Sequence, residues 1–177
     1  LPDKIEKNMA ACMEQKQKEL YHAHAQRLAL MLQNQTEEEF ADSRFQVLSE
    51  LTRLRQLCCD PALVYENYEG GSAKLDLCIE LIQSAVESGH KILLFSQFTS
   101  MIEILTARLQ EESISCFVLQ GSTKKEQRAQ MVEQFNRDDT SVFCISLKAG
   151  GTGLNLTVAD IVIHYDPWWN VAVENQA

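Results

Sequence analysis

The chain has 177 residues, of which 45% are hydrophobic, and a formal net charge of −9. This length is enough for one well-buried core plus an appendage, and the composition excludes a chain that is disordered in bulk. No apolar run approaches the roughly 20 residues that a membrane span needs, so we expect no membrane partner.

Residues 1–71 predict a helical segment. Residues 16–32 have the pattern of a helix, and Thr36 followed by Glu39 is typical of a capping box that opens a second helix. Asp60-Pro61 is expected to end this second helix. We interpret residues 1–71 as a helical linker, or brace, that leads into residues 72–177. The apolar residues expected on one side of the second helix are Phe45, Leu48, Leu51 and Leu54.

From Ser72 onward, helical and extended patterns alternate along the chain. A helix is expected first, and Gly89 provides its stop. Residues 92–95 then form a short continuous apolar run, as expected of a strand that is covered on both faces. The apolar face of the helix consists of Leu75, Cys78, Ile79, Ile82 and Val86.

Three further strands are expected, with two helices opened by capping boxes among them. Ser100 with Glu103, and Thr123 with Glu126, have the spacing of capping boxes. The first of these helices is expected to bury Leu105 and Leu109, and the second Met131, Val132 and Phe135. The strands are expected at residues 114–119, 142–146 and 161–165.

This alternation of helices and strands predicts an α/β domain built from right-handed β-α-β units around a parallel sheet. In open parallel sheets, ligands bind at the carboxyl ends of the strands. Polar and glycine-rich residues follow three of the predicted strands, at residues 96–97, 121–123 and 146–153. One edge of the sheet is therefore expected to gather the candidate binding residues.

The glycine-rich loop at residues 146–156 is the most informative of these segments. Glycine has no Cβ and tolerates positive φ, so such a loop is suited to close contact with a phosphate or a nucleotide. Leu156 stands where a dinucleotide-binding fingerprint needs its third glycine, and no glycine is followed by lysine as in a P-loop. The chain also lacks the Asp-Glu pair of an ATPase. Any nucleotide chemistry therefore needs a second segment that supplies half of the site.

Several segments together resemble a known family: residues 91–98, residues 119–123 with Arg128, Phe135-Asn136, the glycine-rich loop, and residues 166–170. They resemble the second motor lobe of Swi/Snf-type ATPases, which are relatives of superfamily 2 helicases and translocate on double-stranded DNA. Residues 1–6, 17–21 and 54–61 also resemble the segment that leads into that lobe. The resemblance implies a RecA-like three-layer α/β domain with a mainly parallel sheet at residues 72–177, preceded by the helical brace of residues 1–71.

The resemblance also implies two sets of site residues. Residues near the nucleotide would be Gly151, Gly153 and Asn155. Residues facing the DNA backbone would be Ser96, Gln97, Gly121, Ser122, Thr123, Arg128, Ser146, Lys148, Ala149 and Trp168. Backbone amides and a lysine suit phosphate contacts, which position a protein on DNA without reading its bases.

Each candidate also has a plainer interpretation. The glycines can form a tight structural turn, Ser96, Gln97 and residues 121–123 can be capping and turn residues, and Arg128 can be a solvated surface charge. We expect one of Trp168 and Trp169 to be buried and the other functional. Asp166 is expected to orient the preceding loop or to cap a turn. Two further residues are expected to pack in the core, His164 and Cys144.

The chain departs from the family in two places. The family carries an arginine finger beyond the tryptophan pair, whereas no Lys or Arg follows Lys148 here, and Val171 stands where a proline is expected. We therefore expect a piece of a longer polypeptide that ends before the last helicase motif and has no catalytic residue of its own. ATP and Mg²⁺ would be bound mainly by a first RecA-like lobe of the same polypeptide.

Six cysteines include no Cys-x-x-Cys pair, and the adjacent Cys58 and Cys59 lack the spacing of a zinc site. We expect no metal-binding residues and a reducing intracellular compartment: the cytoplasm or nucleoid of a bacterium, or the nucleus of a eukaryote. Residues 90–148 carry seven basic and seven acidic side chains, so the segment that holds most of the candidate sites is neutral. This piece alone is expected to bind DNA weakly, because non-specific affinity comes largely from Lys and Arg.

Three functions follow from these observations. The leading interpretation is the C-terminal lobe of an ATP-dependent double-stranded DNA translocase that remodels protein–DNA complexes and is inactive alone. The alternative is a degenerate helicase lobe that acts as a protein-interaction or regulatory module without motor activity. The third, a nucleotide-sensing α/β domain unrelated to DNA, is disfavoured because the P-loop is missing.

Overall fold

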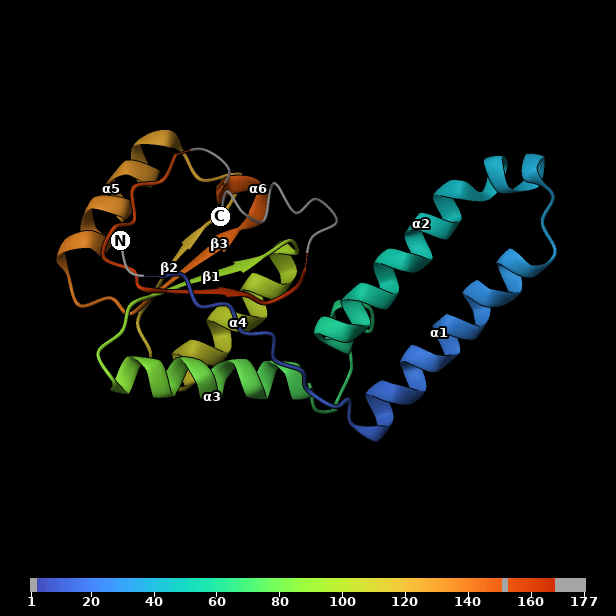
Figure 1. Cartoon of the computed structure of the whole chain (residues 1–177), viewed down its shortest axis with the longest axis horizontal. Coiled ribbons are helices and arrows are strands. Elements are labelled where there is room, and N and C mark those ends of the chain that lie inside the picture. The colour runs from blue at the N-terminus through green and yellow to red at the C-terminus, as the bar shows by residue number, and fades with distance from the viewer. Residues whose placement is uncertain (1–2, 151–152, 168–177) are drawn as a thin grey trace. The chain divides into compact units, whose positions relative to one another are not determined.

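The computed structural model describes residues 3–150 and 153–167. The chain divides into two compact units, Leu1–Leu77 and Cys78–Ala177 (Figure 1). Within the described residues, no helix combines the length and the apolar character needed to cross a membrane. The elements in chain order are α1 (Gln15–Gln33), α2 (Glu37–Cys59), η1 (Pro61–Leu63), α3 (Ala73–Glu87), β1 (Ile92–Ser96), α4 (Thr99–Glu111), β2 (Cys116–Leu119), α5 (Lys125–Arg137), β3 (Val142–Ser146), α6 (Leu147–Gly150) and β4 (Ile161–His164).

Helices α1 and α2 form a hairpin in the first unit (Figure 1). The predicted capping box is confirmed: the Thr36 hydroxyl accepts from the Glu39 N–H, and the Glu39 carboxylate accepts from the Thr36 N–H. Asp60 ends α2 in an extended conformation, and its carboxylate accepts from the Ala62 N–H at 2.8 Å to open η1. Both ends of α2 are therefore set by local hydrogen bonds that the sequence pattern anticipates.

The face that α2 turns to α1 differs from the predicted one. Phe45 and Leu48, expected in the packed stripe, are 74% and 53% exposed. Leu54 is buried and Leu51 is partly buried, as predicted, but they pack with Val47 and with Leu28 of α1 rather than with Phe45 and Leu48. The apolar residues of α2 fit two neighbouring helical faces, and contact with α1 selects one of them.

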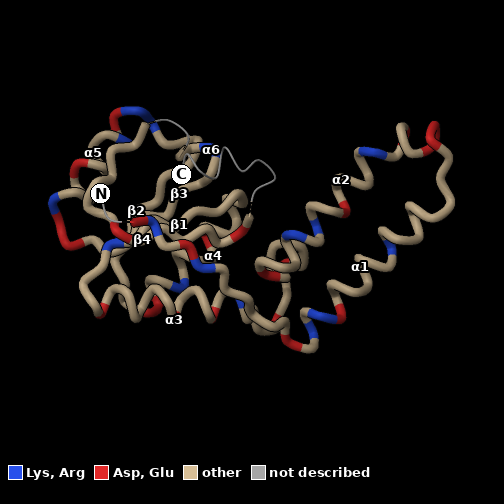
Figure 2. The backbone as a smooth tube through the Cα atoms, in the orientation of Figure 1, with Lys and Arg blue, Asp and Glu red and all other residues tan. Residues whose placement is uncertain are grey.

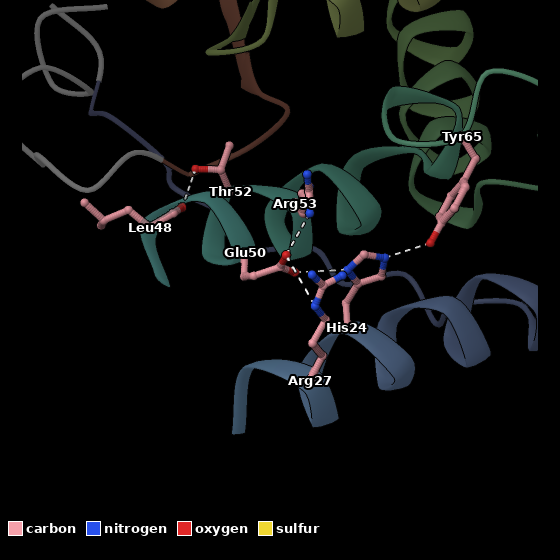
Figure 3. A network of polar contacts seen from close by, with 7 residues as sticks. All are labelled: His24, Arg27, Leu48, Glu50, Thr52, Arg53 and Tyr65. Atoms are coloured by element: carbon pink, nitrogen blue, oxygen red, sulfur yellow. Dashed lines mark hydrogen bonds and ion pairs between the residues drawn. The ribbon is translucent and has the colours of Figure 1, made fainter. Parts of the chain in front are cut away.

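A buried carboxylate, that of Glu50, lies on the face of α2 that packs on α1 (Figure 3). His24 Nδ1 lies 3.2 Å from Glu50 Oε2, Arg53 donates to Oε1 at 2.7 Å, and Arg27 lies 3.9 Å away. The other His24 ring nitrogen, Nε2, lies 2.7 Å from the Tyr65 hydroxyl. Burial alone would raise the pKa of Glu50, but the hydrogen bond with His24 and the charges of Arg27 and Arg53 outweigh burial and lower it.

The lowered pKa of Glu50 predicts a stability loss in acid. A carboxylate with a depressed folded-state pKa contributes stability above its unfolded pKa, near 4.5, and loses that contribution as the pH falls through the folded value. Glu50→Gln is expected to destabilise the hairpin by about 1–2 kcal/mol at pH 7 and to flatten its pH dependence below pH 4.5. Urea unfolding followed by circular dichroism at pH 7 and pH 3 checks this. Glu38→Gln, at an exposed position of the same helix, is the matched control. If acid lowered the free energy of unfolding equally in Glu50→Gln and in the unsubstituted chain, the prediction would be contradicted.

The second unit is built on a four-stranded sheet of order β2-β3-β1-β4, in which all neighbouring strands are parallel. All four predicted strands are confirmed. β1 ends one residue later than expected, β2 begins two residues later, and β4 ends one residue earlier. β1 and β3 are buried along their whole length, as their continuous apolar runs predict. Cys144 lies within β3 and is buried, as expected.

Helices cover both faces of this sheet (Figure 1). α4 buries Met101, Ile102, Leu105 and Leu109. α5 packs on the opposite face together with Leu154 and Leu156, and there Phe135 forms a buried cluster with Phe143 and Ile145. The domain therefore has the three layers expected from alternating helices and strands.

The helix boundaries of this unit were only partly predictable. Gly89 ends α3 with φ of +82°, and the following His90 N–H donates to the carbonyl of Ala85, as in a glycine-based helix stop. The capping boxes predicted at Ser100 and at Thr123 are wrong, because α4 begins after Phe98 and α5 after Lys124, without side-chain caps. The Thr123 hydroxyl instead accepts from the Gln120 N–H at 3.0 Å and so closes the preceding turn.

Candidate nucleotide and DNA interface

The carboxyl ends of the strands bring the candidate segments to one edge of the sheet. Ser96 at the end of β1 lies in register with Ser146 at the end of β3. Both serines are buried, with 0% and 3% of their surface exposed. Neither hydroxyl therefore lies on the surface of this unit.

Asp166 connects the ends of β1 and β4. One carboxylate oxygen accepts from the Ser96 hydroxyl at 2.5 Å, and the other accepts from the Gln97 N–H at 3.1 Å. Asp166 itself is 4% exposed. The same Ser96 oxygen accepts from the Phe98 N–H at 3.2 Å. Asp166 thus holds the loop after β1, 70 residues earlier in the chain, and leaves Gln97 as the more exposed of the two candidates in that loop.

The turn after β2 is held by Arg128 from the first part of α5. Its guanidinium donates to the carbonyl of Thr123 at 3.1 Å and, at 3.4 and 3.5 Å, to those of Gln120 and Gly121. Gly121 and Ser122 remain exposed at the tip of this turn. Arg128 is therefore neither a freely solvated charge nor a fully available phosphate contact, because most of its donors face the turn.

The glycine-rich loop begins with the single turn α6. Ala149 and Gly150 are buried in it, whereas Lys148 is exposed. A Cβ added to Gly150 would lie 2.8 Å from a ring carbon of Phe95, so glycine is needed there for close packing. Gly153 has φ of +53°, and nothing lies within 4 Å of the position of an added Cβ. Its backbone is therefore open to a ligand, which fits the approach of a nucleotide.

Asn136 links α5 to this loop. Its Nδ2 donates to the carbonyl of Asn155 at 2.9 Å, and the Asn155 residue itself is exposed. Lys91 fixes the same end of α5, because its Nζ donates to the carbonyls of Phe135 and Asp138 at 2.6 and 2.5 Å. The sequence pattern predicts no role for Asn136 or Lys91. The one signal for them in the sequence is that both lie in segments that resemble the family.

A groove of about 980 Å³ runs between α5 and the loop. Its basic side chains come from α5, and three residues of the glycine-rich loop also line it. Basic and acidic residues are interspersed along α5 (Figure 2), and Glu133 also lines the groove. The lining residues are Thr123, Lys125, Arg128, Ala129, Val132, Glu133, Asn136, Arg137, Gly153, Leu154 and Asn155.

Some predicted site residues cannot be placed. Gly151 and Trp168 lie outside the described residues, as does Trp169.

His164, expected in the core, is half-buried and stacks on Phe95 with a ring-centroid distance of 5.5 Å. In the described part of the chain, no group of three His, Cys, Asp or Glu side chains could hold a metal ion.

A parallel sheet with helices on both faces, and with polar and glycine-rich loops at the carboxyl ends of its strands, is the architecture expected of a RecA-like lobe. Residues 73–177 match the family described as helicase conserved C-terminal domain. The Sulfolobus solfataricus SWI2/SNF2 ATPase C-terminal domain superposes with a TM-score of 0.85 at 33% identity, covering 98% of this chain and 76% of that one. The chain belongs to the helicase C-terminal domain family and, within it, to the Swi2/Snf2 ATPases.

Two further matches are to longer proteins. Nuclear protein STH1/NPS1 of Saccharomyces cerevisiae is 32% identical over 193 residues, covering 100% of this chain and 14% of that protein. A Sulfolobus solfataricus SWI2/SNF2 ATPase core in complex with double-stranded DNA has a TM-score of 0.83 at 29% identity, covering 99% of this chain and 38% of that one. The chain spans 13 to 15% of the length of the first curated relatives that it matches.

Proposed function

We propose that the chain is the C-terminal lobe of an ATP-driven translocase on double-stranded DNA that remodels protein–DNA complexes, with residues 1–71 as a helical linker and residues 72–177 as the lobe. The single observation that carries the proposal is the gathering of Gln97, Ser122, Lys148 and Gly153 at the carboxyl edge of one parallel sheet. The similarity to an ATPase core solved with double-stranded DNA supports the DNA part of the proposal.

The DNA backbone would be held by the exposed Ser122 and Lys148 and the half-buried Gln97 at this edge. Lys148 offers a charged donor, and Gln97 and Ser122 offer polar groups on loops of fixed geometry. Such contacts bind phosphates without reading sequence, as a translocase requires. Ser96, Ser146 and Ala149, all buried here, would act by shaping these loops, and Thr123 and Arg128 by holding the turn that presents Gly121.

The nucleotide would approach the loop at Gly153 and Asn155. ATP with Mg²⁺ supplies the free energy for movement when it is bound mainly by a first RecA-like lobe. The open backbone at Gly153 and the exposed Asn155 would contact the nucleotide from this lobe. An arginine finger contributes about 10³ to 10⁵ in rate, and no Lys or Arg follows Lys148, so this chain is proposed to be inactive alone.

Steady-state ATP hydrolysis by the full-length protein, with and without duplex DNA, tests the proposal. We expect duplex DNA to stimulate the full-length protein and the 177-residue chain to hydrolyse ATP at least about 10³-fold more slowly. A full-length protein that hydrolyses ATP at the same rate with and without DNA would instead favour a protein-interaction module. Hydrolysis by the 177-residue chain at the full-length rate would contradict a site shared between two lobes.

A further inference from the structure

The stretch from Gly153 to Asn155 needs an external support to hold one conformation. Gly153 is exposed and has φ of +53°, and nothing lies within 4 Å of the position of an added Cβ. The next residue, Leu154, is only partly buried against the core cluster. Apolar contact of this kind limits where the loop lies but does not fix the orientation of its peptide groups, because it is not directional.

Asn136 supplies a directional contact to this stretch. Its side-chain amide donates to the backbone carbonyl of Asn155 at 2.9 Å, 19 residues further along the chain. The bond uses the Asn155 backbone, so the Asn155 side chain is left for other contacts. A hydrogen bond fixes a peptide plane because its strength falls steeply as the angle departs from linear.

The amide of Asn136 comes from a well-anchored position. Phe135, the preceding residue, is fully buried and packs edge-on against Phe143 at 5.2 Å between ring centroids. Lys91, at the start of β1, donates to the carbonyls of Phe135 and Asp138, which flank Asn136 in the chain. The end of α5 is thus joined to the sheet on both sides of Asn136.

We propose that Asn136 is a positioning residue that fixes the nucleotide-facing part of the glycine-rich loop through the carbonyl of Asn155. This inference rests on the proposed function, because the loop is taken to contact ATP. Asn136 itself touches neither nucleotide nor DNA in this role. It transmits the rigid position of α5 to the backbone on which Gly153 and Asn155 lie.

Asn136→Asp tests the bond with almost no change of shape. A carboxylate cannot donate to the Asn155 carbonyl and would face it with a second acceptor. In the full-length protein at saturating duplex DNA, we expect kcat/KM for ATP to fall about 10- to 100-fold, through a raised KM for ATP. The DNA concentration for half-maximal stimulation is expected to change less than about 2-fold. The loops of Gln97 and Ser122 are held by Asp166 and Arg128, and Lys148 lies in α6 between the buried Leu147 and Ala149.

Two further variants separate positioning from simple folding. Asn136→Gln keeps an amide donor and is expected to retain kcat/KM within about 3-fold. Gln130→Ala removes an amide from an exposed position of the same helix and is expected to behave as the unsubstituted protein. If the substitution only impaired folding, it would lower the active fraction and therefore kcat, and the KM for ATP would stay the same. An Asn136→Asp enzyme with an unchanged KM for ATP, whether or not its kcat falls, would therefore overturn the proposal.

Hydrogen exchange of the full-length protein supplies a readout that does not depend on activity. We expect Asn136→Asp to speed exchange in residues 153–160 by about tenfold and to leave residues 142–146 unchanged. Unchanged exchange in residues 153–160 would overturn the proposal whatever the ATPase result. If duplex DNA does not stimulate hydrolysis by the unsubstituted protein, the proposed function fails. Faster exchange in residues 153–160 of Asn136→Asp would then still support the hydrogen bond between Asn136 and Asn155.

Discussion

Replacing Phe135 with alanine is expected to destabilise the second unit by about 3–5 kcal/mol, the cost of removing a fully buried aromatic side chain. Phe135 is 0% exposed and joins α5 to the sheet through Phe143. Its ring also lies 4.7 Å from the Nζ of Lys91, so the variant loses a cation–π contact as well as packing. Alanine would leave a cavity in the cluster that holds α5 on the sheet.

Native-state hydrogen exchange of the β1 and β3 amides measures this loss, because those strands open only when the second unit unfolds. Phe135→Leu, which keeps most of the volume, is expected to lose less stability than the alanine variant. Gln130→Ala, at an exposed position of the same helix, should cost no more than about 0.5 kcal/mol. A loss below 1 kcal/mol for Phe135→Ala would contradict the assignment of this ring to the core.

Replacing Asp166 with alanine is expected to cost about 2–5 kcal/mol, because two donors lose their acceptor together. The Ser96 hydroxyl is buried and the Gln97 N–H is partly buried, so water replaces the carboxylate poorly. Asp166→Asn is expected to cost about 1 kcal/mol, since its amide oxygen still accepts one hydrogen bond and its NH₂ group can donate to the Ser96 oxygen.

A double-mutant cycle isolates the Asp166 contact. Ser96→Ala, Asp166→Ala and the double variant are compared by the same exchange measurement of the β1 amides. We expect a coupling of about 0.5–3 kcal/mol, with the double variant losing less stability than the two single losses combined. Additive losses would show that Asp166 stabilises the unit without the Ser96 contact, and would contradict the role assigned here to that hydrogen bond.

The strands and their parallel arrangement could be predicted because they depend on local patterns. β1 and β3 are continuous apolar runs, and each ends at a serine that the structure places at the carboxyl edge. A residue pattern of this kind is typical of a strand buried on both faces, and the intervening helices impose parallel pairing. The positions of the candidate loops followed from the same reasoning.

Helix starts and helix faces were less predictable. The Thr123 hydroxyl had two partners within reach, the N–H groups of the following helix and that of Gln120, and it bonds to Gln120. In α2, Phe45 and Leu48 fit a packed stripe by spacing, but the carboxylate of Glu50 lies inward because His24 and two arginines accompany it. The outcome depends on a residue 26 positions earlier in the chain, which a local pattern does not include.

Local patterns also fail to identify the residues that support the candidate site. Loops carrying Gln97, Ser122 and Lys148 could be placed at one edge, but the residues that hold them could not be identified. Asp166 acts on a loop 70 residues before it, and Asn136 acts on one 19 residues after it. Such pairs follow from tertiary packing rather than from any periodicity of the sequence.

The central position of β1 sets a constraint on how the chain folds during synthesis. Ile92 pairs with Ile161, 69 residues later, so one side of β1 has no partner strand until β4 is made. At about 5–20 residues per second, this interval lasts roughly 3–14 s. Both sides of β1 are unpaired until β3 is made, and the side that later pairs with β4 then remains an open sheet edge, which is a template for pairing with other chains. A chaperone or the ribosome surface that protects nascent chains in which β1 has been made but β4 has not would therefore raise the yield of folded protein.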